Sequence, residues 1–572
     1  MPWTLYRYIL RELLKVLVLT TTVLVVVLSF GAAVGPMADG LLGPVTLVKF
    51  VLYTMPTVLG FALPFAGAFS ATLVFHAMAK DNEILACRAG GMSYSRIFAP
   101  IAMLGLVLML VLLLLSNTLV PGFWKAAKKT VEGDVLGVLV SQLNQNRPYM
   151  LGNDTLVLSA DAAEVREPPP GSSTGNLKAE QFIVMTGVAV GQYEKDSQTV
   201  IADTTASTAS ALLVRDENGK AYISLRLRDP VHYNAASGQF ETVGRSGTLE
   251  TDQPILLPDP IADEAVFFTF EDLMRLKESP EQFDLVREAQ NDLAASISRQ
   301  QLINLIIESL GPETGPGFIT LKGGLPNTYY RLSSPIVDVN ERGLVLTGGD
   351  EIRVTIDRYD NPQLIGDPIR RFEADYAEVS VRTDRFDREP EASITMRNVS
   401  VLGLNDSGAV NNKEEYAFPA MRHTAQVLGE DPTNLSTEQL HEWTRRASMI
   451  DSASVQNARL NLSFTIYQLK YMIEAELHTR LATSLATPLL LLLGTLLAVR
   501  MRDRLPLVVF FWAFILAIVT LVMIYTGSSM AERIDINNIQ GGDRLVGMGI
   551  LWGGNLLLLF VIARLYLRVA RN

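Results

Sequence analysis

The residues of Glu83–Ser93 have types and a spacing suited to binding a protein partner. Glu83 and Arg88 belong to a stretch that mixes polar and apolar residues at helical spacing, and the pattern stops at Gly90-Gly91. This predicts a short amphipathic helix that docks into a groove of a partner, where Glu83 could pair with a basic residue. An amphipathic helix lying at the lipid headgroups would explain the same residues equally well.

Sequence patterns for catalysis or metal binding do not occur. There is no G-x-x-x-x-G-K-[ST] phosphate loop, no H-E-x-x-H pair and no G-x-S-x-G nucleophile. The five histidines are scattered and Cys87 is the only cysteine, so no zinc site and no intramolecular disulfide are predicted. Acidic pairs such as Asp263-Glu264 are typical of a solvated surface. We therefore expect no catalytic residues, no metal and no cofactor.

The charge is divided unevenly along the chain of 572 residues. Residues 121–478 hold 33 Lys and Arg against 52 Asp and Glu, whereas the rest of the chain holds 16 against 8. Nucleic-acid binding needs basic patches on the soluble part of a protein, and here that part would repel phosphate. A nucleic-acid partner is therefore excluded.

Six apolar stretches, three near each end of the chain, are long enough or nearly long enough to cross a bilayer, which takes about 20 residues as a helix. They run approximately over residues Leu13–Val34, Phe50–Met78, Ile97–Val120, Leu481–Val499, Pro506–Tyr525 and Leu545–Ala563. Such a pattern is typical of a multi-pass membrane protein. The first stretch is read as an uncleaved span because two more follow closely.

Basic residues flank these stretches on one side of the predicted bilayer. If the six helices alternate in direction, four clusters share one face: Arg7, Arg11 and Lys15; Lys80, Arg88 and Arg96; Arg500, Arg502 and Arg504; Arg564, Arg568 and Arg571. The positive-inside rule makes this face cytoplasmic. Both termini and segment 79–96 are then cytoplasmic, and residues 121–478 lie outside the cytoplasm.

The middle of the chain shows two regions of strand pattern, each followed by a helical pattern. Strands are predicted at Tyr149–Ser159, Gln181–Tyr193, Tyr222–Leu227, Gly247–Thr251, Leu344–Thr347, Ile352–Tyr359, Ala377–Val381 and Ser393–Val401, with a hairpin turn at Asn218-Gly219. Helices are predicted at Phe270–Leu276, Leu285–Leu310 and from Thr437 onward.

Short similarities separated by about 165–172 residues suggest an internal duplication. Phe270–Leu273 (FEDL) parallels Thr437–Leu440 (TEQL), and Ser298–Leu302 parallels Thr465–Leu469. Chance similarity between amphipathic segments is the alternative. The predicted fold class is an α-helical membrane protein with a 3+3 arrangement of spans and a large extracytoplasmic β domain of two tandem jellyroll-like units with helical tails. The predicted domains are residues 1–120, 121–310, 311–478 and 479–572.

Two motifs resemble a known family. The pattern E-x-x-A-x-R-A-x-G-x-S at Glu83–Ser93 is similar to the coupling segment of the lipopolysaccharide-export permeases LptF and LptG (the YjgP/YjgQ family), and Glu476–Pro488 looks like the family's entry into its fourth membrane helix. By this resemblance Glu83, Arg88, Gly91 and Ser93 belong to the segment that meets a cytoplasmic ATPase dimer of the LptB type.

The resemblance also implies the partners and the task. Family members pair as two related LptF/LptG permeases in the bacterial inner membrane, extract lipopolysaccharide and pass it to a periplasmic jellyroll bridge of the LptC/LptA kind. The first helix lacks the basic residue with which the family can hold a lipid phosphate, so Lys49, Lys125, Lys128 and Lys129 are candidates instead. Interfacial lysines that snorkel are the simpler interpretation.

Two further classes of function fit parts of the sequence. A membrane-anchored envelope sensor or scaffold, whose periplasmic domain binds a ligand or partner, would explain the spans but not Glu83–Ser93. A membrane-bound enzyme would need a catalytic site, and the sequence offers none. We therefore expect a permease without an ATP site of its own.

Overall fold

The structure, a computed structural model, describes residues 3–571 with gaps between elements. The gaps are residues 39–43, 133–134, 152–155, 170–172, 175–176, 194–199, 216–220, 235–238, 243–247, 251–254, 257–264, 312–314, 324–327, 341–342, 350–351, 361–366, 384–389, 404–409, 424–434 and 534–541. The predicted turn at Asn218-Gly219 lies outside the described residues.

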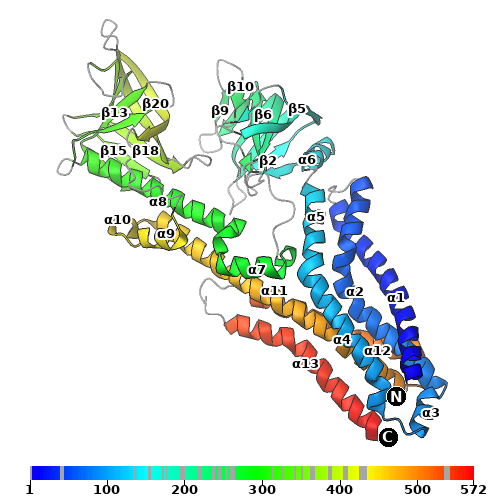
Figure 1. Cartoon of the computed structure of the whole chain (residues 1–572). Helices are drawn as coiled ribbons and strands as arrows, with labels where there is room; N and C mark the ends of the chain where they lie inside the picture. Colours follow the sequence, from blue (N-terminus) through cyan, green and yellow to red (C-terminus); the bar gives the residue numbers. More distant parts are fainter. Residues whose placement is uncertain are drawn as a thin grey trace. The chain divides into compact units, whose positions relative to one another are not determined.

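Six helices in the described part of the chain are long and apolar enough to cross a membrane. They are α1 (Trp3–Ala38), α2 (Pro44–Lys80), α4 (Tyr94–Leu114) continued by the π-helical turn η1 (Leu115–Leu119) into α5 (Val120–Glu132), α11 (Ala453–Arg500), α12 (Pro506–Glu532) and α13 (Gly542–Arg571). Each contains one of the six predicted spans, so the prediction of three spans at each end is confirmed. Figure 1 shows that both chain ends lie at the same end of the helix bundle as the short helix α3 (Glu83–Ala89).

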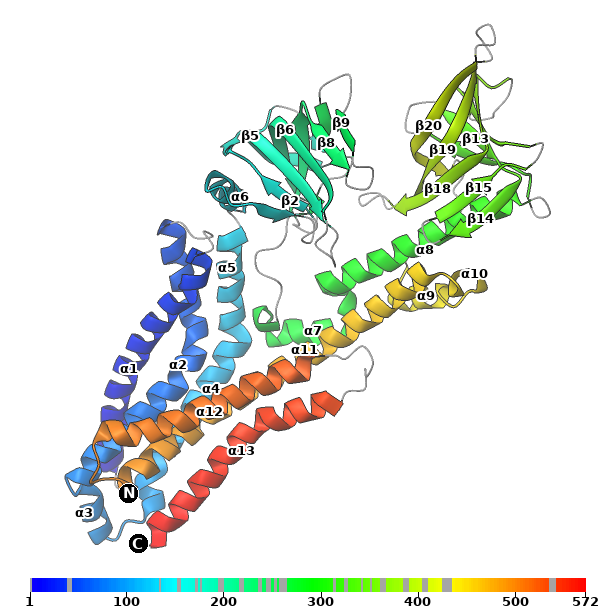
Figure 2. The same cartoon turned by 180° about the vertical axis from the view of Figure 1, so that it is seen from behind.

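Small residues let the membrane helices approach one another closely. A Cβ atom at Gly105 of α4 would lie 2.8 Å from Pro488 Cβ on α11, and one at Gly494 of α11 would lie 2.7 Å from the Ala68 carbonyl oxygen on α2. Gly554 of α13 meets the backbone of α12 in the same way, and Figure 2 shows these two helices side by side. Glycine at these positions therefore sets the helix spacing.

The first β region is an antiparallel sheet of eleven strands that follows α6 (Val135–Asn144). Its central path is β1-β2-β5-β6-β7-β10. The strands are β1 (Tyr149–Leu151), β2 (Leu156–Ser159), β3 (Ala162–Arg166), β4 (Ser173–Thr174), β5 (Leu177–Tyr193), β6 (Val200–Arg215), β7 (Ala221–Arg228), β8 (Val231–Asn234), β9 (Gln239–Thr242), β10 (Thr248–Glu250) and β11 (Ile255–Leu256).

The second β region is an antiparallel sheet of nine strands in the order β14-β15-β18-β19-β17-β16-β13-β12-β20. Since β20 pairs with both β12 and β19, part of this sheet closes on itself. The strands are β12 (Ile319–Lys322), β13 (Tyr329–Ser333), β14 (Ile336–Asn340), β15 (Gly343–Thr347), β16 (Val354–Tyr359), β17 (Arg370–Ala374), β18 (Tyr376–Thr383), β19 (Pro390–Gly403) and β20 (Val410–His423).

Each sheet is followed by a short helix and then by a long one. After the first sheet come η2 (Ala265–Phe267), α7 (Phe270–Glu278), η3 (Pro280–Gln282) and α8 (Asp284–Leu310); after the second come α9 (Thr437–Trp443), α10 (Ala447–Ile450) and α11. Both α7 and α9 begin with a reciprocal capping box, Thr269 with Asp272 and Ser436 with Gln439. The repeated order supports the predicted duplication, and the two sheets with helical tails confirm the predicted fold class.

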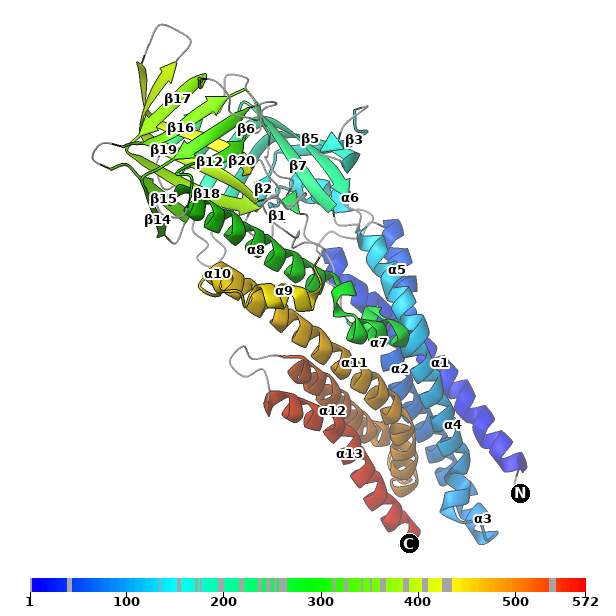
Figure 3. The same cartoon turned by 60° about the vertical axis from the view of Figure 1, so that its left-hand side comes forward.

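The chain forms two compact units, residues Met1–Met274 with Tyr471–Asn572, and residues Arg275–Lys470. Within the second unit α8 contacts α9 and α10, as Figure 3 shows, and Asn304 Nδ2 donates to the Ser448 carbonyl oxygen at 3.1 Å. The predicted domain boundaries after residues 120, 310 and 478 stay predictions.

Candidate functional site

The predicted docking segment forms a short helix between α2 and α4. Two residues in left-handed backbone conformations bracket it, Asn82 at φ 59° and Gly91 at φ 81°. Gly91 tolerates this conformation because it has no Cβ, and the chain can therefore turn sharply into α4. Ile84 is buried in the bundle, whereas Leu85 is 58 % exposed. The helix thus presents an apolar side chain to its surroundings while one side is held to the bundle.

The four predicted residues of this segment do not form one cluster. The Tyr8 hydroxyl on α1 donates to Glu83 Oε1 at 3.5 Å, and the Arg88 guanidinium lies 4.2 Å from the centre of the Tyr94 ring. Ser93 Oγ lies 3.0 Å from Ser95 Oγ just before α4. The side chains of Glu83 and Arg88 thus brace α3 against α1 and α4.

Two neighbouring residues were not singled out from the sequence as site residues. His76 is buried near the end of α2, and its Nε2 donates to the Arg504 carbonyl oxygen at 2.7 Å. This bond joins the α11–α12 turn to the helix that leads into α3. Burial raises the pKa of the Cys87 thiol, and the Glu83 carboxylate adds to the effect, so Cys87 has little thiolate character.

The four candidate lysines are in different environments. Lys49 is exposed on α2, while Lys125 on α5 pairs with Asp272 of α7 at 3.4 Å. Burial by itself would raise the pKa of the Asp272 carboxyl, but hydrogen bonds from Thr269 and the Lys125 charge outweigh it and hold the pKa below its usual range. Lys128 and Lys129 belong to α5, but their side chains lie outside the described part of the structure.

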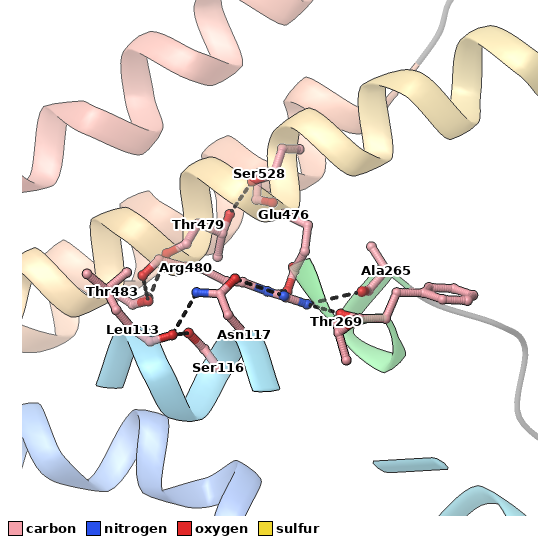
Figure 4. A network of polar contacts seen from close by, with 12 residues as sticks. Leu113, Ser116, Asn117, Ala265, Thr269, Glu476, Thr479, Arg480, Thr483 and Ser528 are labelled. Atoms are coloured by element: carbon pink, nitrogen blue, oxygen red, sulfur yellow. Dashed lines mark hydrogen bonds and ion pairs between the residues drawn. The ribbon is translucent and has the colours of Figure 1, made fainter. Parts of the chain in front are cut away.

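A buried arginine on α11 forms a second polar cluster at the end of the bundle opposite α3, shown in Figure 4. Arg480 is 5 % exposed, and its Nε donates to Glu476 Oε1 at 2.7 Å. Its Nη2 donates to two carbonyl oxygens of the chain ahead of α7, at 3.2 Å to Ala265 and 2.9 Å to Phe268. Burying an unpaired charge costs several kcal/mol, about the scale that these contacts offset.

The same guanidinium reaches the π-helical turn at the end of α4. Arg480 Nη1 donates to Asn117 Oδ1 at 3.3 Å, and Asn117 Nδ2 donates to the Leu113 carbonyl oxygen at 2.7 Å. Asn117 therefore satisfies a carbonyl at the wide turn and also holds Arg480. Single π-turns inside α-helices occur frequently at functional sites.

Comparison with known families decides the identity of the chain. Residues 7–298 and 348–568 match the family described as lipopolysaccharide export system permease LptF/LptG. The chain belongs to this family. No match was found among curated proteins.

Membership confirms the resemblance inferred from Glu83–Ser93 and Glu476–Pro488, which both lie within the matched ranges. The permease is a multi-pass inner-membrane component of the lipopolysaccharide export system, and it is a transporter component and not an enzyme. Residues 299–347, which include the end of α8 and strands β12–β15, lie between the two matched ranges. Among the residues that the structure describes, no group of three or more His, Cys, Asp or Glu could hold a metal ion.

Proposed function

We propose that this permease uses ATP hydrolysis by a separate cytoplasmic ATPase dimer of the LptB type to extract lipopolysaccharide, and that α3 is the contact with that ATPase. The observation that carries the proposal is the construction of α3. Its exposed Leu85 lies on a helix that Ile84, Glu83 and Arg88 fasten to three membrane helices. A groove on a partner that received Leu85 could therefore move those membrane helices directly.

Glu83→Lys tests this contact. The substitution reverses the charge at the start of α3 and is expected to abolish co-purification of the ATPase while the permease still inserts in the membrane. Asp503→Lys is the matched control, since Asp503 is an exposed carboxylate in the α11–α12 turn outside α3. Unchanged ATPase binding and lipid export by the Glu83→Lys variant would refute the proposed contact.

The proposed orientation places both termini and α3 in the cytoplasm and residues 121–478 in the periplasm. Its support is the set of arginines and lysines around α3, the α11–α12 turn and the two chain ends. The test is protease digestion of vesicles of both orientations. Cleavage of residues 121–478 from the cytoplasmic side would reverse the assignment.

We further propose that the permease works beside a second LptF/LptG-type permease and passes its lipid to a periplasmic jellyroll bridge of the LptC/LptA kind. Apolar side chains of α1 and α12 that are exposed in the single chain, such as Val18, Leu19 and Phe511, fit contact with lipid or with a second permease. Lys49 is exposed and suits a lipid phosphate, whereas Lys125 is engaged by Asp272. Lys49→Glu should then lower the amount of lipopolysaccharide that co-purifies, and an unchanged amount would remove Lys49 from the proposal.

A further inference from the structure

The chain passes twice between its two compact units, and the buried arginine fastens both passages together. Residues Ala265–Asp272 lead toward the unit that begins at Arg275, and α11 leads back from it at Tyr471. Arg480 on α11 holds the carbonyl oxygens of Ala265 and Phe268. We call this arrangement the neck junction; it consists of Asn117, Trp124, Lys125, Ala265–Asp272, Glu476 and Arg480.

The incoming passage is held from α5 as well. The Trp124 ring lies edge-to-face on Phe267 at 5.4 Å, and Lys125 Nζ lies 5.5 Å from the centre of the Phe268 ring. The Lys125–Asp272 pair then reaches the capping box that starts α7. The incoming passage is thus gripped by α5 through aromatic contacts and by α11 through Arg480.

The chemistry of the junction requires arginine in particular. A guanidinium is planar and carries five N–H donors in a fixed fork, so it can bind a carboxylate, an amide and two carbonyls at once. A lysine ammonium is a compact charge that could satisfy Glu476 but could not span the other three acceptors. Ionisable residues in membrane helices are rare and mark functional positions by default.

We propose that Arg480 and Asn117 are positioning residues for transport, which make α7 follow the movement of α4 and α11. This inference rests on the proposed function. The two passages are the only covalent routes between the compact units, since each unit boundary lies in α7 or α11. A helix shift that began at α3 would therefore reach the second unit with its phase fixed by the Arg480 contacts.

Lipid export per ATP hydrolysed, measured with the assembled complex in proteoliposomes, tests the proposal. The paired variant Arg480→Met with Glu476→Met replaces a buried ion pair by apolar side chains of similar volume, an exchange that is often tolerated. We expect it to assemble and hydrolyse ATP while exporting about three- to ten-fold less lipid per ATP, the scale of mutations in coupling networks. Arg480→Lys should show the same loss because it keeps the charge but not the fork.

The control is Arg544→Met with Glu474→Met, an ion pair that joins α13 to α11 without touching Ala265–Phe268. It should export at the wild-type ratio. An equal loss in this control would reduce the effect to general loosening of α11 and overturn the inference. If wild-type complexes export no lipid, the proposed function fails and the inference with it; if wild type exports and the paired Arg480 variant exports equally, the inference alone fails.

A single cysteine gives a second measurement. In a Cys87→Ser background, Ala265→Cys places a thiol at a position that is 5 % exposed and leaves the carbonyl that accepts from Arg480 in place. We expect a charged maleimide to label it slowly in the resting complex and faster both during ATP turnover and in Arg480→Lys. Equal labelling rates in all three states would show that the junction does not open and would overturn the inference.

Discussion

Removing only Arg480 should destabilise the permease more than removing both members of its ion pair. In Arg480→Met the Glu476 carboxylate, with a side chain 16 % exposed, loses its cation, and the carbonyl oxygens of Ala265 and Phe268 lose their donor. Breaking a buried pair on one side typically costs about 3–5 kcal/mol. We place the loss at about 3 kcal/mol because Glu476 keeps some contact with its surroundings.

A double-mutant cycle measures how much of this loss belongs to the pair. Glu476→Met should cost about 2 kcal/mol, since Arg480 keeps its bonds to Asn117 and the two carbonyls, and the paired variant also about 2 kcal/mol. The coupling free energy is then about 3 kcal/mol, the upper end of the range for residues in contact. Unfolding of the detergent-solubilised permease by sodium dodecyl sulfate, followed by circular dichroism, gives the four values. A coupling below about 0.5 kcal/mol would refute the interpretation of Arg480 as a strongly paired cation.

Other predictions concern packing, pH and capping. Gly105→Leu should prevent close packing of α4 on Pro488 of α11 and strongly reduce the folded yield, which gel filtration of the solubilised protein measures. Burial and two arginine charges lower the pKa of His441 in α9; the neutral form therefore stabilises the fold above pH of about 6.5, and this contribution disappears as the pH falls through the lowered folded pKa. Hydrogen exchange in α9, corrected for its intrinsic pH dependence, should thus quicken below that pH in wild type but not in His441→Gln. Ser436→Ala removes the bond to the Gln439 amide and should lower the local stability of α9 by about 1 kcal/mol in the same exchange experiment.

The membrane helices could be predicted from the sequence because their signal is local. Runs of Leu, Val and Ile identify a span without knowledge of its neighbours, and all six were found in the right order. Most predicted strands correspond to observed ones for the related reason that alternating residues identify a half-buried strand. The segment at α3 could be found as well, because its pattern stops at Gly90-Gly91.

Two long strands were missed because their composition does not favour strands. The centre of β6 is a run of Ala, Thr and Ser, and only its position between β5 and β7 buries Ala209, Ala211 and Leu213. The predicted second β region ended near residue 404, but β20 extends it to His423 through the polar segment Asn411–Glu415. In both strands, pairing with neighbours determined by the whole sheet overrides local preference.

The neck junction could not be predicted because its contacts join residues that are far apart in the sequence. Arg480 appeared in a motif, but its acceptors lie 363 residues away at Asn117 and more than 200 away at Ala265 and Phe268. The acceptors are a side-chain amide and two backbone carbonyls, which no residue pattern identifies. A lone arginine beside an apolar run was the only available signal, and a snorkelling side chain gives the same signal.

The helix that starts beside α3 ends at the neck junction, so the two candidate sites lie on one rigid element. From Tyr94 to Leu114, α4 has 21 residues, which gives about 32 Å of helix and matches the thickness of a bilayer core. At its far end η1 carries Asn117, and α5 continues to Trp124 and Lys125. A displacement of α3 therefore has a direct mechanical path to Arg480, and η1 is the one irregular turn on that path within the described residues.

Deleting one residue of η1 separates the two grips on the incoming passage. A π-turn holds one residue more than an α-turn, so deletion of Thr118 should close the turn as α-helix, keep the phase of α5 with its Lys125 contact, and withdraw Asn117 from Arg480. We expect near-normal assembly with lowered lipid export per ATP. Deletion of Leu110, in the regular part of α4, should instead rotate everything beyond it by about 100° and prevent assembly. Normal export by the Thr118 deletion would show that the π-turn and Asn117 have no part in coupling.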